Sequence, residues 1–513
     1  MGRGRNIGVV GVATLILVAA ALGGCAADTP KAARAVTSTT AAFDPSKAGT
    51  VTITGPVANG GGHVTLAGGN LDLATVGYTE SEYLIAGNAS SYATDHPLTT
   101  DGRWAVHVDA HAPFVTRVVV RRPADAATFS GNVAVEWLNV SGGLDAAPDW
   151  TTTHVEMIRR GWAWVGVSAQ SVGVEGGSDS VGGDFALKKN DPARYGTLSH
   201  PGDSFSYDMF SQAGAAVRTQ PGVLLGGLPV KRVLAMGESQ SAFRLSTYVN
   251  AVAPLNHIYD GYFIHSRAGT AAPLAQSPQK AVEAPEVSRV RTDLRVPVLV
   301  YSSESDLVGD ELGYAKARQP DSAWFRGWEV AGSSHEDAYG LGIGDSDDGS
   351  GQGDARLFAA LTNPPAKVYG GVISCDRPIN SGGQTYVLRA ALRAMETWMA
   401  TGTPPASMPP LKLEGTDYAR DDHGIAIGGI RTPEVDVPIA ALSGLGQSGG
   451  SFCFLFGTTA PFDATRLRTL YPDHAAFVAD WTRAVQAGVA AKVILGADAR
   501  QLLAAATAST VGA

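Results

Sequence analysis

Short, almost uninterrupted apolar runs alternate with amphipathic stretches through the first two thirds of the chain. The apolar runs predict strands and the amphipathic stretches predict helices. Strands are expected at residues 114–120, 133–138, 162–167, 233–237, 262–264, 296–301 and 327–330, and helices at 152–160, 207–218 and 242–248. Because strands without polar alternation are buried on both faces, this order predicts an α/β fold whose mostly parallel sheet carries helices on both faces.

The two ends of this region differ from its centre. Before it, the β-prone segments 51–54 and 64–66 are separated by glycine-rich turns and predict a hairpin. After it, a strong helical pattern over 386–399 ends at Gly402 and the prolines that follow. We therefore expect a core with inserted loops over residues 47–405.

The last hundred residues mix β-prone pieces with two helical patterns, near 473–487 and 497–506. No long linker precedes them. Domain boundaries usually fall in exposed linkers, so we interpret residues 406–513 as an α+β extension that packs on the core.

The N-terminus has the pattern of a targeting segment. Arg3 and Arg5 precede an apolar stretch that ends just before Cys25, which predicts a lipoprotein-type signal peptide over residues 1–24. Cleavage there would leave Cys25 as the lipidated first residue of a flexible tether over 25–46, anchored to the outer face of the cell membrane. The alternatives are an ordinary secretory signal or a stop-transfer anchor, with Cys25 incidental.

Composition narrows the class of protein. A hydrophobic content of 44% with 17% charged residues predicts a substantial packed core. The net charge of −9 comes without a basic run, so nucleic acid is not an expected partner. Besides Cys25, the chain has only Cys375 and Cys453, which in an exported protein are either bridged or two buried free thiols.

The segment around Ser239 carries the first candidate chemistry. A predicted strand ends at Gly237, Ser239 follows, and a helical segment begins at Ala242. This is the pattern of a nucleophile elbow, a tight turn that exposes a serine hydroxyl above a sheet. The usual final glycine is replaced by Ser241, another small residue, so this motif alone is weak evidence.

An acid and a base follow in the order that such folds use. Asp306 and Glu304 lie in the turn after a predicted strand, and His335 comes after the next one. A serine needs a neighbouring histidine to take its proton and a carboxylate to orient that histidine. We favour Asp306 as the acid, because its shorter side chain lies further around the turn, and keep Glu304 as the alternative.

Acyl transfer also needs donors for an oxyanion. One is expected to be the amide of Gln240, directly after the nucleophile. The second should come from the loop after an earlier strand, where the amide of Val140 or Ser141 is the candidate. The alternative is that Ser141 and the two glycines after it form only a flexible turn.

The elbow, the Glu304/Asp306 turn and the segment 328–335 resemble the α/β-hydrolase superfamily. They resemble more closely a bacterial group described as α/β-hydrolase domain proteins, and the likeness extends over about residues 50–505. The resemblance implies the α/β-hydrolase fold and serine-dependent hydrolysis, with esters the expected substrates. It does not imply a particular substrate.

The expected function is that of an exported serine hydrolase, which cleaves a small-molecule or lipid carboxylic ester through an acyl-enzyme. Two alternatives remain: an envelope acyltransferase with the same three residues, and a catalytically dead binding lipoprotein. No glycine run matches a phosphate-binding loop and no metal-ligand spacing occurs, so neither cofactor nor metal is expected. The oligomeric state is left open.

Loops with irregular sequence are expected to form the pocket walls, at 173–203, 267–292 and 342–380. His265 and Arg267 either line the pocket or form a charged surface pair. Glu238 either tunes the pocket or favours the start of the helix after the serine.

Overall fold

The structure, a computed structural model, describes residues 43–178, 185–309, 311–450 and 452–512. The predicted signal peptide, Cys25 and nearly all of the predicted tether lie outside these residues. Contacts between residues group the described residues into one compact unit. Within the described ranges, no helix is both long and apolar enough to cross a lipid bilayer.

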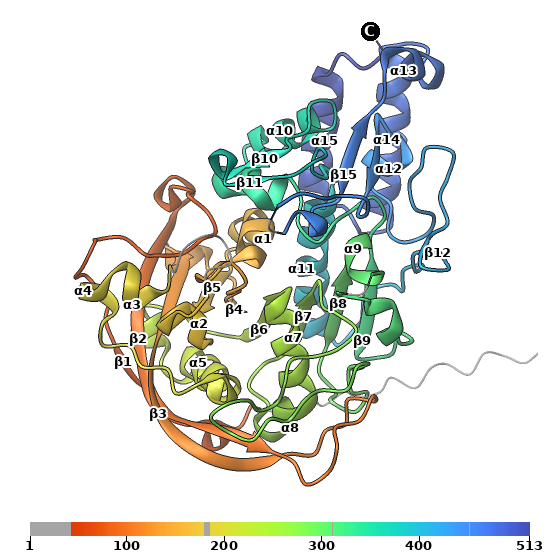
Figure 1. The fold of residues 1–513 in the computed structure, drawn as a ribbon. Helices are drawn as coiled ribbons and strands as arrows, with labels where there is room; N and C mark the ends of the chain where they lie inside the picture. Colours follow the sequence, from red (N-terminus) through yellow and green to blue (C-terminus); the bar gives the residue numbers. More distant parts are fainter. Residues whose placement is uncertain (1–42, 179–184, 310, 451, 513) are drawn as a thin grey trace, which may run out of the picture. The chain divides into compact units, whose positions relative to one another are not determined.

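A nine-stranded sheet runs through the described chain in the order β1-β2-β3-β5-β4-β6-β7-β8-β9 (Figure 1). The strands are β1 Thr52–Thr54, β2 Tyr78–Ala93, β3 His107–Pro123, β4 Asn132–Trp137, β5 Ala163–Val167, β6 Arg232–Glu238, β7 Gly261–His265, β8 Val298–Ser302 and β9 Phe325–Glu329. The six strands from β5 to β9 are parallel to their neighbours, and β1, β2 and β3 add an antiparallel edge. The predicted mostly parallel sheet is confirmed.

Helices cover both faces of this sheet (Figure 1). The α-helices are α1 Pro148–Arg159, α2 Ser171–Glu175, α3 Leu187–Asn190, α4 Pro192–Tyr195, α5 Ser206–Thr219, α6 Pro221–Leu224, α7 Gln240–Thr247, α8 Ala253–Asn256, α9 Glu304–Leu307, α10 Gln352–Ala360, α11 Gln384–Thr401, α12 Pro433–Asp436, α13 Ala464–Leu470, α14 His474–Ala490 and α15 Gly496–Ala508. The longer ones include the predicted helices, with boundaries shifted by a few residues.

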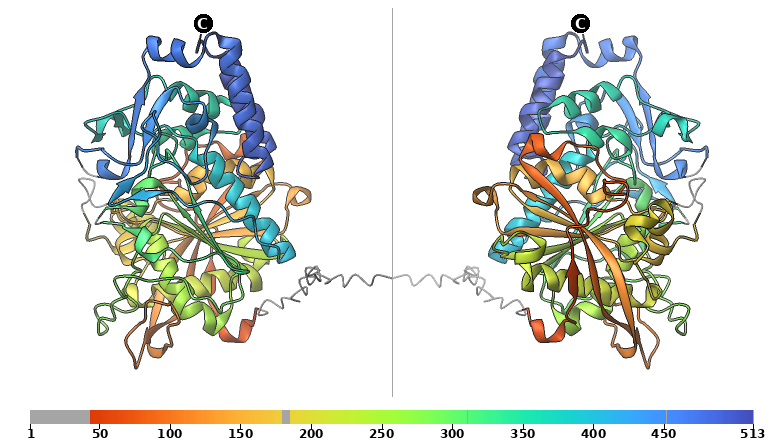
Figure 2. Two further views of the ribbon diagram at one scale, coloured as in Figure 1. Left: turned by 90° about the vertical axis from the view of Figure 1, so that its right-hand side faces the viewer. Right: turned by 90° about the vertical axis from the view of Figure 1, so that its left-hand side faces the viewer.

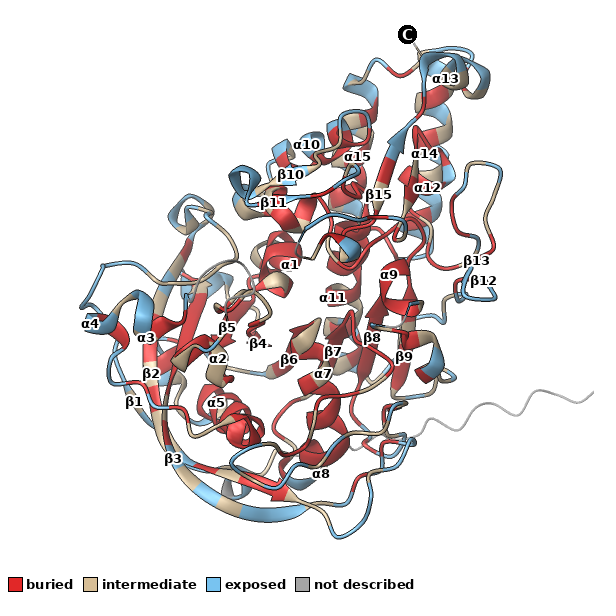
Figure 3. Ribbon diagram, in the orientation of Figure 1, coloured by how far each residue is buried: buried red, intermediate tan, exposed pale blue. Residues whose placement is uncertain are grey.

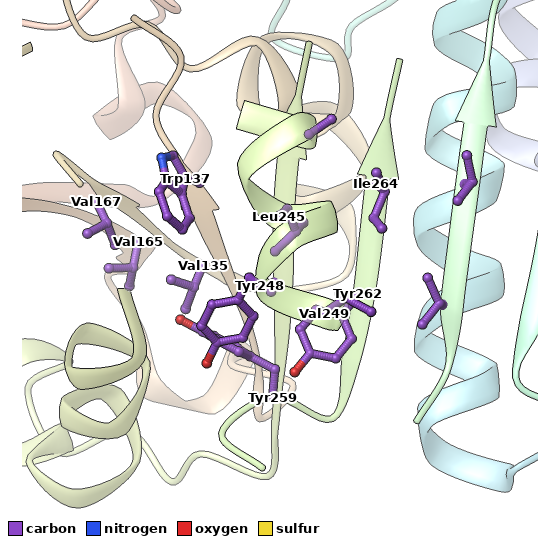
Figure 4. Packing of buried hydrophobic residues seen from close by; sticks show 14 of the residues in the cluster. Val135, Trp137, Val165, Val167, Leu245, Tyr248, Val249, Tyr259, Tyr262 and Ile264 are labelled. Atoms are coloured by element: carbon purple, nitrogen blue, oxygen red, sulfur yellow. The ribbon is translucent and has the colours of Figure 1, made fainter. Parts of the chain in front are cut away.

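Successive residues of the central strands enter two different hydrophobic clusters. In β4, Val133 and Val135 join one cluster with side chains of α5 and α7, whereas Ala134 joins a second cluster with α1 and α11. Figure 4 shows Val135 in the first cluster with Leu245 of α7 and with Tyr248, the residue that follows this helix. Alternate side chains of a strand point to opposite faces, so a central strand buries both of its faces and is mostly apolar, and Figure 3 shows these strands buried.

The predicted hairpin between segments 51–54 and 64–66 is wrong. β1 pairs antiparallel with β2, where Thr52 lies opposite Ala86. Segment 64–66 forms no strand, and the chain beyond it is held by the bridge between Ala67 and Ala146.

The C-terminal region adds three small antiparallel pairs and the last helices. The pairs are β10 Lys367–Val368 with β11 Ile373–Ser374, β12 Leu413–Glu414 with β13 Asp417–Tyr418, and β14 Ala440–Ser443 with β15 Thr458–Pro461. Helices α14 and α15 lie side by side at one end of the unit (Figure 2). Arg389 of α11 is fully buried and pairs with Asp498 of α15 at 3.1 Å, so the extension joins the core through a buried ion pair.

Candidate functional site

Ser239 occupies the tight turn that the sequence predicts. β6 ends at Glu238 and α7 begins at Gln240, so Ser239 alone connects strand and helix. Its φ of 57° and ψ of −123° are uncommon for a residue with a side chain. A Cβ at Gly237 would lie 3.1 Å from the carbonyl oxygen of Ser241, closer than such atoms normally approach. Gly237 therefore lets the first turn of α7 lie close behind the serine.

Three of the predicted residues meet in one line of contacts. The Oγ of Ser239 lies 2.7 Å from Nε2 of His335, and Nδ1 of His335 lies 2.6 Å from Oδ1 of Asp306. His335 and Asp306 are buried, whereas Ser239 is half-buried. With a proton on Nδ1 shared with Asp306, Nε2 presents its lone pair to the serine hydroxyl. This arrangement can move a proton from Ser239 to His335.

The surroundings of Asp306 keep its carboxylate ionised. Burial alone would raise the pKa of Asp306, but the neighbouring His335 and the Ser303 amide lower it below its usual value. The Ser303 amide donates to Oδ2 at 2.6 Å, while Oδ1 accepts from His335. Asp306 is thus charged at neutral pH, as the orientation of an imidazole requires.

Glu304, the alternative acid, faces away from His335 and binds two backbone amides. Its Oε1 accepts from Gly332 at 2.6 Å and its Oε2 accepts from Gly444 at 2.9 Å. Burial raises the pKa of Glu304 to about 7. Glu304 therefore joins the turn after β9 to the C-terminal extension, and of these two candidate acids Asp306 is the one that contacts His335.

The three candidate oxyanion donors differ in whether their amide N–H already donates a hydrogen bond within the protein. The Ser141 amide donates to the side-chain oxygen of Asn139 at 2.8 Å. In the part of the chain that the structure describes, the amides of Val140 and Gln240 donate no hydrogen bond. The side chain of Asn139 also donates to the Glu238 carbonyl at 3.2 Å, which ties this loop to the elbow. Val140 and Gln240 are thus the amides left available for an oxyanion.

Glu238, whose role the sequence left open, lies beside the histidine. Its Oε1 is 3.1 Å from Nε2 of His335, and its Oε2 accepts from Asn139 at 3.0 Å. Burial raises the pKa of Glu238 well above its usual value, and nearby carboxyl groups add to this effect. Its position next to Ser239 was the only signal in the sequence, because nothing local predicts the direction of its side chain.

A cavity of about 440 Å³ opens above Ser239 and His335; we call it the Ser239 cavity. Its wall combines the elbow residues Glu238 and Ser239 with parts of five further segments: 66–70, 139–151, 335–345, 369–373 and 452–456.

Cys375 and Cys453 form a disulfide with their Cα atoms 5.5 Å apart, which joins the last of these segments to the chain after β11. Of the predicted pocket walls, only the loop 342–380 contributes. The described residues of 173–203 and 267–292 do not line the cavity, so the prediction is wrong for these two loops.

His265 and Arg267 do not line the cavity either. Nδ1 of His265 lies 2.9 Å from Asp149, and burial lowers the pKa of His265 to about 3, so its ring is neutral. The guanidinium of Arg267 is buried and donates to backbone carbonyls. Among the described residues, no group of three or more His, Cys, Asp or Glu side chains is arranged to hold a metal ion.

A model of the protein family described as "Alpha/beta hydrolase domain" matches residues 53–504. No curated protein sequence matches the chain.

Several solved structures are similar to it. A serine hydrolase without a lid from Xanthomonas campestris has 13% identity and a TM-score of 0.25, over 42% of this chain and 78% of that one. A lipase/esterase from Lactobacillus plantarum has 11% identity and a TM-score of 0.24, over 40% and 78%. Fungal esterases from Rhizomucor miehei give 13% identity and a TM-score of 0.26, over 51% and 82%.

Proposed function

The chain belongs to the alpha/beta hydrolase domain family, and we propose that it is a serine esterase with Ser239 as its nucleophile. The observation that carries this proposal is the line of contacts from Asp306 through His335 to Ser239, at 2.6 and 2.7 Å. A serine hydroxyl becomes nucleophilic when an adjacent imidazole takes its proton, and a carboxylate on the other ring nitrogen fixes the tautomer.

In the proposed reaction, Oγ of Ser239 bonds to the ester carbonyl carbon while its proton moves to Nε2 of His335. The carbonyl oxygen becomes an oxyanion and accepts hydrogen bonds from the amides of Gln240 and Val140. His335 then gives the proton to the alcohol oxygen as the ester C–O bond breaks, which leaves the acyl group on Ser239.

Hydrolysis of the acyl-enzyme follows the same path in reverse. Water gives a proton to His335 and bonds to the acyl carbon, and the bond from that carbon to Ser239 breaks. The proton returns to Oγ, and the free acid leaves. Asp306 stays ionised throughout and stabilises the imidazolium that forms twice in each cycle.

A fluorophosphonate probe and short p-nitrophenyl esters test this proposal. The wild type is expected to be labelled at Ser239 and to hydrolyse p-nitrophenyl acetate, whereas Ser239→Ala loses both properties. Ser407→Ala, which removes an exposed hydroxyl outside the Ser239 cavity, is the matched control and should keep both. Full activity in Ser239→Ala would contradict the proposal.

Product analysis distinguishes hydrolysis from acyl transfer to an alcohol. An esterase releases free acid at the same rate when low concentrations of an acceptor alcohol are added. If the acceptor instead takes most of the acyl group, the chain is an acyltransferase that uses the same three residues.

We also propose that the protein is exported and anchored through a lipid on Cys25. The support is the basic start, the apolar stretch and the cysteine directly after two glycines. Cys25→Ala is expected to move the protein from the membrane fraction to the soluble fraction. Retention of Cys25→Ala in the membrane fraction would contradict lipid attachment.

A further inference from the structure

Acidic side chains line the Ser239 cavity, and no Lys or Arg among the described residues does. Glu238, Glu336 and Asp345 contribute carboxyl groups to the wall. Most of the remaining wall is apolar, and Tyr369 adds an aromatic ring. Carboxylates that share such a cavity repel one another, because little water separates them.

Glu238 presents a buried carboxyl oxygen that lacks a hydrogen bond. Its side chain is 3% exposed, and no described residue donates to Oε1. The nearest charged neighbour is His335, whose Nε2 lies 3.1 Å away. That nitrogen faces the hydroxyl of Ser239 with its lone pair, so it does not donate to Glu238. A buried acceptor of this kind calls for a donor or a cation from outside the chain.

Glu336 and Asp345 lie on other parts of the wall. The carboxylate of Glu336 lies against Gly340, where a Cβ would overlap its Oε2. Asp345 accepts from the Gly69 amide at 3.2 Å. Burial and the neighbouring carboxyl groups raise the pKa of Glu336 to about 8, and burial raises the pKa of Asp345. A positive charge in the cavity would lower these pKa values and favour the ionised form of all three carboxyl groups at once.

We propose that the substrate is an ester carrying a positively charged nitrogen, which the carboxyl groups of Glu238, Glu336 and Asp345 bind within the Ser239 cavity. This inference rests on the proposed esterase function. An organic cation fits the site better than a metal ion, since these carboxyl groups are not arranged as metal ligands within the described residues. The ring of Tyr369 and the apolar wall suit an alkylammonium group.

Two esters of the same shape test this inference. Acetylcholine carries a quaternary nitrogen, and 3,3-dimethylbutyl acetate has a neutral carbon in its place. We expect the wild-type kcat/KM to be about tenfold or more higher for acetylcholine, and Glu336→Gln and Asp345→Asn each to reduce this ratio severalfold. Glu414→Gln removes an exposed carboxylate outside the cavity and is the matched control, with an unchanged ratio.

Protection against the fluorophosphonate probe gives a second measurement, which does not require either ester to be cleaved. Tetramethylammonium chloride is expected to slow labelling of Ser239 relative to sodium chloride at the same ionic strength, and to do so less in Glu336→Gln. Gly340→Ala displaces the Glu336 carboxylate without changing any charge, and it should weaken this protection too.

The outcomes separate this inference from the proposed function. A kcat/KM ratio of one or less together with no protection overturns the cation site, while labelling of Ser239 still supports the esterase. If the wild type is neither labelled at Ser239 nor able to hydrolyse p-nitrophenyl acetate, both the cation site and the proposed esterase function are overturned. Thermal unfolding of each variant shows that a reduced ratio comes from a folded protein.

Discussion

Replacement of Asp306 by asparagine tests the role of the buried carboxylate beneath His335. The substitution keeps the shape of the side chain but exchanges one oxygen for an amide nitrogen. Oδ1 accepts from His335 at 2.6 Å and Oδ2 accepts from Ser303 at 2.6 Å, so the new NH₂ group must face one of two donors. If it faces His335, the ring carries its proton on Nε2, which then cannot accept the proton of Ser239.

The size of the effect follows from the geometry of this contact. The Asp306 carboxylate is fully buried, so water can neither screen nor replace its bond to the imidazole. We expect kcat on p-nitrophenyl acetate to fall by about 10³ to 10⁴, which is about 4 to 5 kcal/mol of activation free energy. KM should change little, because Asp306 does not line the Ser239 cavity.

Glu304→Gln is the matched variant in the same turn. Glu304 is equally buried, but its partners are the amides of Gly332 and Gly444. The Glu304→Gln substitution should therefore lower the free energy of unfolding by about 1 to 3 kcal/mol and leave kcat nearly unchanged. Steady-state kinetics and urea unfolding of both variants measure kcat and the free energy of unfolding and so test these expectations. A fully active, folded Asp306→Asn, or an inactive Glu304→Gln of normal stability, would refute the reasoning.

Three further predictions concern pH, the disulfide and the elbow. Burial raises the pKa of Glu304 from 4.5 to about 7, so the folded protein keeps a proton that the unfolded chain loses. The free energy of unfolding should therefore fall as pH rises through this range, and this fall should be smaller in Glu304→Gln, by up to about 3 kcal/mol. Urea unfolding at a series of pH values measures it, and the same dependence on pH in both proteins would contradict the prediction. Removal of the disulfide by Cys375→Ser with Cys453→Ser should cost about 4 kcal/mol of stability and raise KM, and an unaltered unfolding curve would count against it. Gly237→Ala places a Cβ 3.1 Å from the Ser241 carbonyl oxygen, so fluorophosphonate labelling should slow at least tenfold; a normal rate would show that the turn adapts.

Except for β1 at the sheet edge, the strands that the sequence predicted are those buried on both faces, where apolar residues follow one another. β2 was missed because its buried face carries charges. Glu82 of β2 pairs with Arg117 of β3 at 3.2 Å and with Arg194 at 2.5 Å, and all three side chains are buried. These ion pairs allow charged side chains inside the sheet, and a pattern of hydrophobic positions cannot reveal partners that lie elsewhere in the chain.

The sequence likewise predicts some features of the candidate site and not others. The order of Ser239, Asp306 and His335 along the chain is enough to predict them together, because each follows a strand that ends at one edge of a parallel sheet. The choice between Asp306 and Glu304 depends on side-chain direction, which the sequence does not specify. The acidic wall of the cavity joins distant segments of irregular sequence, so no local pattern identifies it.

The two oxygens of Asp306 link the first turn of α9 to the orientation of His335. Oδ2 holds the Ser303 amide at the start of the helix, and Oδ1 holds the imidazole. Any opening of this turn that releases the amide also releases the ring, so the two fluctuations are one event. Hydrogen exchange at the Ser303 amide therefore measures how often the line of contacts to Ser239 is broken in the resting protein.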